Sequence, residues 1–273
     1  ALEHNNSSLY YMPDVPASAK SFMLEQLQST SAHEFYHTVT PLNLHSEEIG
    51  NFDFNNPVMS EHLWLYEGVT EYNAEYIQLR EGLKTPEDFR EDIERKLNSA
   101  SRYIDTLPFT VMSKGALDEY EPQYQNVYEK GALIGMCLDI LIREGSNGQQ
   151  GLQDVINKLS EKYGKDRPFK DEDLFGEIEI LTTPKVREFL DLYVAGTNRI
   201  PYEEIFAKVG FEVKKDPFEM LNISGVSMGF NQETFRLKVV NIGTSDNKFI
   251  NQLGLKSGDE LVSVNGQPIT FQN

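Results

Sequence analysis

The sequence has few positive charges and no long apolar run. No stretch of about eighteen apolar residues occurs in the 273-residue chain, which excludes a transmembrane helix. Lys and Arg number 25 against 43 Asp and Glu, and the formal net charge of −18 argues against nucleic acid or an anionic membrane as a partner. The opening residues, ALEHNNSSLY, also lack the basic and apolar regions of a signal peptide.

Cysteine is nearly absent too. The one cysteine, Cys137, lies in an apolar segment and cannot form an internal disulfide, so we expect a small buried side chain there. Apolar residues make up 39% of the chain and charged residues 25%, which is ordinary for a globular protein. The length fits one large domain with an appendage, or two domains.

Helical patterns fill the first three quarters of the chain. Apolar spacing predicts helices over about 17–37, 61–81, 85–98, 127–144, 151–163, 171–180, 184–195 and 202–208. Thr85 and Pro86 mark one of these helix starts clearly, as a cap and a first-turn proline. Beyond about residue 222 the pattern becomes strand-like. We therefore predict a mainly α domain over residues 1–215 and a β-rich domain over residues 216–273.

The motif that carries chemistry is His33-Glu34-Phe35-Tyr36-His37, an HExxH on a predicted helix. Residues four apart lie on one helical face, so His33 and His37 can reach one metal ion. Glu34 points about 100° around the helix, beside the ion, where a general base can take a proton from water. The pentapeptide alone leaves another interpretation open, in which the two histidines serve only packing or the surface.

A second motif, WLYEG at residues 64–68, offers a third ligand on another predicted helix. Zinc in hydrolytic sites takes three protein ligands and leaves one position to water. We therefore predict that His33, His37 and Glu67 bind one Zn²⁺. Glu71 lies one turn after Glu67, where it could orient a ligand histidine or could equally be a plain surface acid.

HEFYH followed by LWLYEGVTEY resembles the glutamate-liganded zinc peptidases. Within that group, the opening Leu2-Glu3-His4, the YEKG segment at 128–131 and the stretch YVAGTNRIPYEEIFAKVGF resemble the glycyl aminopeptidase family. The resemblance implies a thermolysin-like catalytic domain over residues 1–215, without its N-terminal β domain, and a partial PDZ-like domain over 216–273. It also implies a zinc metallopeptidase with a peptide or protein substrate and an extracytoplasmic location, periplasmic or surface-anchored.

The same resemblance gives roles to further residues. Tyr128 would donate a hydrogen bond to the oxyanion formed at the attacked carbonyl, with Tyr124 as a competing candidate. Glu3 would bind the free α-amino group of the substrate, as in an aminopeptidase, unless it is a surface carboxylate near the chain end. After His37 the family commonly has a tryptophan and basic residues, which this chain lacks, so a preference for N-terminal glycine stays open.

The C-terminal part shows a resemblance of its own. Residues 254–270, GLKSGDELVSVNGQPIT, look like the core of a PDZ domain, and residues 227–230, SMGF, resemble its carboxylate-binding loop. A C-terminal peptide could therefore occupy a groove in this domain. Two functions compete with that of an aminopeptidase: an endopeptidase assisted by the PDZ domain, and a non-catalytic protein that holds metal and binds peptides.

Overall fold

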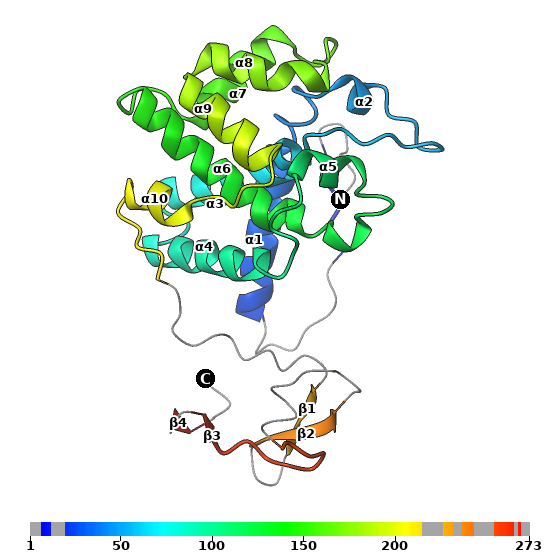
Figure 1. Cartoon of the computed structure of the whole chain (residues 1–273), viewed down its shortest axis with the longest axis vertical. Helices are drawn as coiled ribbons and strands as arrows, with labels where there is room; N and C mark the ends of the chain where they lie inside the picture. The colour runs from blue at the N-terminus through cyan, green and yellow to red at the C-terminus, as the bar shows by residue number, and fades with distance from the viewer. Residues whose placement is uncertain are drawn as a thin grey trace. The chain divides into compact units, whose positions relative to one another are not determined.

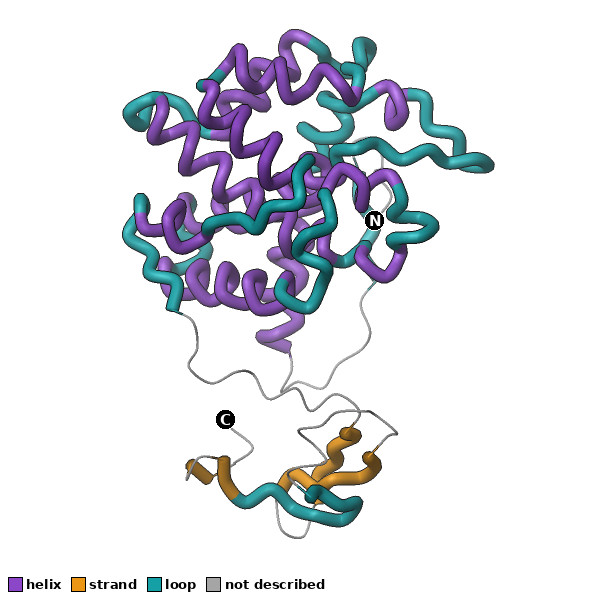
Figure 2. Tube along the Cα trace, viewed as in Figure 1, coloured by secondary structure: helices purple, strands orange, loops and turns teal. Residues whose placement is uncertain are grey.

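Helices joined by loops make up the N-terminal part of the chain (Figures 1 and 2). The computed structural model describes residues 7–11, 20–214, 226–231, 236–242, 254–264 and 267–268. The chain divides into two units, Ala1–Val213 and Lys214–Asn273. The mostly helical character of the first unit confirms the prediction of a mainly α domain.

The helices follow the predicted order. The α-helices are α1 (Lys20–Tyr36), α2 (Glu47–Gly50), α3 (Thr70–Arg80), α4 (Pro86–Ala100), α5 (Phe109–Lys114), α6 (Asn126–Gly145), α7 (Leu152–Lys162), α8 (Leu174–Leu181), α9 (Pro184–Phe189) and α10 (Tyr202–Ala207). Among the described residues, two π-helical segments, η2 (Trp64–Val69) and η5 (Leu190–Val194), and two 3₁₀ turns, η3 (Glu121–Gln123) and η4 (Asp171–Asp173), accompany them. The helix predicted over 61–81 is therefore a π-helical turn that leads into α3.

The start of α4 is built as the sequence predicts. Thr85 is the N-cap, its hydroxyl accepts a hydrogen bond from the backbone N–H of Asp88 at 3.2 Å, and Pro86 is the first helical residue. The carboxylate of Asp88 accepts the N–H of Thr85 in return, at 2.8 Å. This reciprocal pair satisfies two donors that a helix start otherwise leaves without partners.

Helix α6 is the centre of the first unit. All its residues from Lys130 to Ile142 are buried, and it packs against η2, α3, α4, α7, α9 and α10. A helix that is apolar nearly all round belongs in a core. Cys137 is completely buried in it, as predicted.

Helix α6 and segment η2 approach each other through two glycines. A Cβ atom placed on Gly68 would lie 2.6 Å from the carbonyl oxygen of Gly131, and one placed on Gly131 would lie 2.9 Å from Cα of Gly68. The two backbones are therefore in direct contact, which side chains larger than hydrogen would prevent. Every residue of η2 is buried, by this contact with α6 and by the other segments packed around it.

The entry to η2 is fixed by Asp171 in the turn η4. Its carboxylate accepts hydrogen bonds from the hydroxyl of Ser60 and the N–H of Glu61, both at 2.7 Å. Its carbonyl oxygen accepts the Nε2–H of His62 at 2.9 Å, while Nδ1 of His62 accepts the indole N–H of Trp64 at 3.1 Å. Burial lowers the pKa of His62, so its ring stays neutral and can accept and donate in this way.

Strands are the only regular elements among the described residues of the second unit. Strands β1 (Val226–Asn231) and β2 (Arg236–Ile242) pair antiparallel, with an irregularity in register between Ser227 and Met228. Strands β3 (Ser263–Val264) and β4 (Gln267–Pro268) form a second antiparallel pair. The identification of this unit as a partial PDZ-like domain stays a prediction. Within the described residues, no helix has the length and apolar character needed to cross a bilayer.

The glycine contact gives a first testable prediction. Gly68→Ala should lower the free energy of unfolding by about 1–3 kcal/mol, because the added methyl group would collide with the backbone of Gly131. Gly176→Ala in α8 is the matched control, since its Cβ would have only the guanidinium of Arg187 near it, at 3.9 Å. That change should be neutral or stabilise by up to about 1 kcal/mol. Urea unfolding of both variants checks this, and an unchanged midpoint for Gly68→Ala would contradict the tight contact.

Candidate metal centre

The two histidines of the HExxH motif lie at the C-terminal end of α1 and point to the same place. His33 and His37 are both buried, and Glu67 reaches them from η2. The Oε2 atom of Glu67 lies 3.2 Å from Nε2 of His33 and 3.6 Å from Nε2 of His37. One ligand atom from each of the three residues lies within 4.8 Å of the others. The structure thus brings together the three residues that the two motifs predict.

The spacing of these atoms fits a small divalent cation. Ligand atoms at about 2.0–2.2 Å from a tetrahedral zinc ion lie about 3.3–3.6 Å from one another. The two carboxylate–imidazole distances, 3.2 and 3.6 Å, agree with that spacing, and the ligand nitrogens of the two histidines lie within 4.8 Å of each other. Two imidazole nitrogens and one carboxylate oxygen are also the donor types of hydrolytic zinc sites.

The other ring nitrogens are held so that each Nε2 faces this shared point. Nδ1 of His37 donates to the carbonyl oxygen of Thr40 at 2.9 Å, which can only accept. Nδ1 of His33 donates to Oε2 of Glu71 at 2.8 Å. In each neutral imidazole the lone pair is then on Nε2, the atom that faces Glu67.

The charges around His33 favour a cation. Burial alone would lower the pKa of His33, but its hydrogen bonds with Glu67 and Glu71 outweigh burial and raise the pKa to about 9. For Glu71, burial alone would raise the pKa, but the hydrogen bond with His33 and the charge of Lys96 outweigh burial and lower the pKa to about 2. Without a metal ion, the site is therefore held together by the proton on His33. A metal ion must displace that proton, so its affinity should increase with pH.

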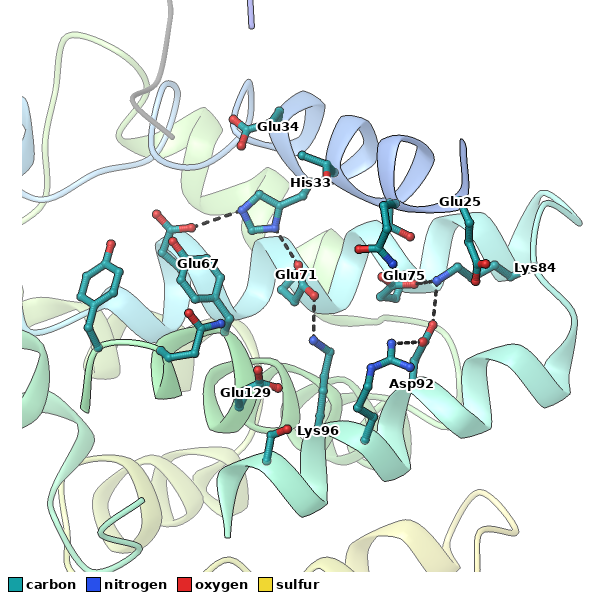
Figure 3. Close-up of a pocket in the computed structure, with 18 residues that line it drawn as sticks. Glu25, His33, Glu34, Glu67, Glu71, Glu75, Lys84, Asp92, Lys96 and Glu129 are labelled. Carbon is teal, nitrogen blue, oxygen red and sulfur yellow. Dashed lines mark hydrogen bonds and ion pairs between the residues drawn. The ribbon is translucent and has the colours of Figure 1, made fainter. Parts of the chain in front are cut away.

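A cavity of about 680 Å³ is lined by two of the three candidate ligands, His33 and Glu67 (Figure 3). Glu34 lines it from α1, next to His33, and is half-buried. In the view of Figure 3, the carboxylate of Glu34 points to the side of the His33 ring where Glu67 lies. A base at this position can reach a water molecule in the cavity.

Tyr128 lines the same cavity from the first turn of α6. Its ring centre lies 5.8 Å from that of His33. Burial, and then the charge of Glu67, raise the pKa of Tyr128 well above its ordinary value. Its phenol therefore keeps its proton and is a hydrogen-bond donor. Tyr124, the competing candidate, also lines the cavity, with its ring centre 6.1 Å from that of Tyr128.

Of the two other predicted residues, the structure describes Glu71 but not Glu3. Glu71 contacts a candidate ligand, which favours the orienting interpretation over a surface acid. Glu3 lies outside the described residues. Two lysines beside the site, the half-buried Lys84 and the buried Lys96, were not predicted from the sequence. Lysine is ordinarily a surface residue, and no spacing rule distinguishes a buried one.

Comparisons with known proteins agree with the motifs. Residues 26–134 match the family model for M61 glycyl aminopeptidase, which confirms the resemblance to that family. The solved structure of an aminopeptidase N family protein from Idiomarina loihiensis matches with a TM-score of 0.68 and 19% identity. The match covers 96% of this chain and 47% of that one, so the two share a fold and this chain spans about half of that protein. No curated protein sequence matches the chain.

Metal binding at this site can be measured through stability. Zn²⁺ at about 100 times its dissociation constant should raise the free energy of unfolding of the chelator-treated protein by about 2.7 kcal/mol. Glu67→Gln should lose most of this gain, because the oxygen shared by both histidines becomes a neutral amide. Glu129→Gln, a change in the lining of the same cavity, should keep it. Melting curves recorded with and without zinc measure this gain in stability for each protein. An equal gain in Glu67→Gln would show that the ion binds elsewhere.

Proposed function

We propose that this chain, whose residues 26–134 match the family model for M61 glycyl aminopeptidase, is a zinc-dependent peptidase that acts as an aminopeptidase. The observation that carries the proposal is the convergence of His33, His37 and Glu67 at the edge of a cavity. Glu34 and Tyr128 line that cavity and supply a base and a hydrogen-bond donor. These five residues are the complete set that metal-assisted peptide hydrolysis needs.

The proposed mechanism assigns one task to each group. A Zn²⁺ ion bound by His33, His37 and Glu67 would polarise the substrate carbonyl and lower the pKa of water toward about 7. Glu34 accepts the proton of the attacking water and then transfers it to the nitrogen of the leaving amine. The phenolic O–H of Tyr128 donates a hydrogen bond to the oxyanion that develops on the carbonyl. Such a hydrogen bond is worth about 3–4 kcal/mol in comparable sites.

The charges of the cavity support a substrate with a free amino group. Seven carboxylates and three cations line it. Each cation is paired with a carboxylate: Lys84 with Glu75 and Asp92, Arg95 with Asp92, and Lys96 with Glu71. The excess of negative charge favours a protonated amine such as the N-terminus of a peptide. The part proposed for Glu3 in holding that amine rests on the family resemblance alone.

Two other proposals rest on the resemblance alone. One is a peptide-binding groove in residues 216–273, which would take the C-terminus of a partner or substrate. The other is an extracytoplasmic location. An endopeptidase assisted by that groove is the nearest alternative to an aminopeptidase.

Replacement of the proposed base tests the mechanism. Glu34→Gln should keep the bound zinc but lower kcat by about 100- to 10,000-fold, because an amide cannot accept the proton. Zinc content and the rate of hydrolysis of a peptide with a free N-terminus are measured together. Glu91→Gln, an exposed change on α4 outside the cavity lining, is the control with unchanged rate. Full activity of Glu34→Gln would rule out this residue as the base.

A pair of peptides that differ only at the N-terminus tests the substrate class. The peptide with a free α-amino group should be hydrolysed, and its N-acetylated twin should not, since acetylation removes the charge that the cavity favours. Product masses identify the bond that is cleaved. Equal cleavage of both peptides would instead identify an endopeptidase, and cleavage of neither by the zinc-loaded protein would favour the non-catalytic alternative.

A further inference from the structure

A chain of two contacts leads from helix α4 to the candidate ligand His33. The ammonium of Lys96 donates to Oε1 of Glu71 at 2.7 Å, and Oε2 of Glu71 accepts from Nδ1 of His33 at 2.8 Å. Figure 3 shows the three side chains in a row, from α4 through α3 to α1. Both oxygens of Glu71 are therefore occupied, each by a different helix.

The environment of Lys96 makes this contact more than a surface ion pair. The side chain of Lys96 is 8% exposed and that of Glu71 21% exposed. An ion pair held away from water is costly to break, because the remaining charge is left desolvated. Glu71 is thus held in one orientation by Lys96, with Oε2 directed to the imidazole.

The two histidines differ in what fixes them. Nδ1 of His37 is bonded to a backbone carbonyl, that of Thr40, which the turn after α1 holds in place. Nδ1 of His33 depends on a side chain, which in turn depends on Lys96. The orientation of His33 is the less secure of the two, and α4 is the element that secures it.

We propose that Lys96 is a positioning residue of the metal centre, which holds His33 in its ligand orientation by way of Glu71. The proposal rests on the zinc site proposed above and assigns a task to a helix that contributes no ligand. It differs from a substrate-binding role, because its effect is on the metal site itself and needs no substrate.

Lys84, which lines the same cavity, offers a matched comparison. Its side chain is also 8% exposed, and its ammonium pairs with Glu75 of α3 and, at 2.7 Å, with Asp92 of α4. Lys84 therefore joins the same two helices as Lys96, through carboxylates that contact neither histidine in the described structure. Its loss should affect stability without moving His33.

The experiment compares zinc affinities without substrate, by competition with a chromophoric chelator. Lys96→Met should weaken zinc binding by about 10- to 100-fold, the range found for other outer-shell partners of ligand histidines. Lys84→Met should change it less than about twofold, although both variants unfold at lower urea concentration. Lys96→Arg should recover part of the affinity, because it restores a charged donor to Glu71.

A double mutant separates an effect through Glu71 from a general loosening of the fold. Glu71→Gln combined with Lys96→Met should bind zinc as weakly as Glu71→Gln alone, since residues that act in series are not additive. Equal losses for the two lysine variants, or losses that add in the double mutant, would overturn the proposal. If Lys96→Met does not fold, Lys96→Gln replaces it with the same expectation.

Failure of this proposal is distinguishable from failure of the zinc site. If the unmodified protein binds zinc and Glu67→Gln abolishes binding, the site stands, and unchanged affinity in Lys96→Met refutes only the role of Lys96. If zinc binding is indifferent to Glu67, both proposals fall together.

Discussion

The backbone contact between Gly68 and Gly131 is the constraint on which the candidate site depends. Glu67 directly precedes one of these glycines, and Tyr128 lies about one turn before the other. The close approach of η2 and α6 therefore sets the positions of both Glu67, a candidate metal ligand, and Tyr128, a candidate hydrogen-bond donor to the oxyanion. The glycines of WLYEG and YEKG have a packing reason in this structure, separate from the chemistry of the residues beside them. The π-helical form of η2 fits the same constraint, because such turns change which side a helix presents and are frequent at functional sites.

The histidine side of the site is prepared before any ion binds. Both Nδ1 atoms are bonded to acceptors, and both Nε2 atoms lie within 3.6 Å of one carboxylate oxygen of Glu67. In the metal-free state the raised pKa of His33, about 9, means that a protonated imidazole lies between the carboxylates of Glu67 and Glu71 near neutral pH and offsets part of their charge. An ion that replaces the proton would find its ligands close to their final spacing. Little reorganisation then opposes binding, which is the advantage of a preformed site.

The sequence predicts the parts of this arrangement that follow local rules. Helix periodicity, the Thr85 cap and the i, i+4 spacing of His33 and His37 depend on neighbours along the chain, and the structure agrees with each. Short α5 escapes prediction, because six residues after Pro108 are too few to show a period and carry no polar cap. The π-helical turn and the buried Lys96 escape for another reason. Both result from contacts between segments far apart in the sequence, Gly68 with Gly131 and Lys96 with Glu71.

The distribution of charge in the cavity also bears on the direction of attack on a peptide. With every carboxylate ionised and His33 neutral, as a metal ligand must be, the lining carries four more negative than positive charges, and a bound divalent cation would offset half of that excess. A cavity that stays negative with its ion bound repels the C-terminal carboxylate of a peptide and attracts its N-terminal amine. The pairing of Lys84, Arg95 and Lys96 with carboxylates strengthens this conclusion, since those cations are already engaged. For the proposed peptidase, this charge therefore favours removal of residues from the N-terminus over removal from the C-terminus.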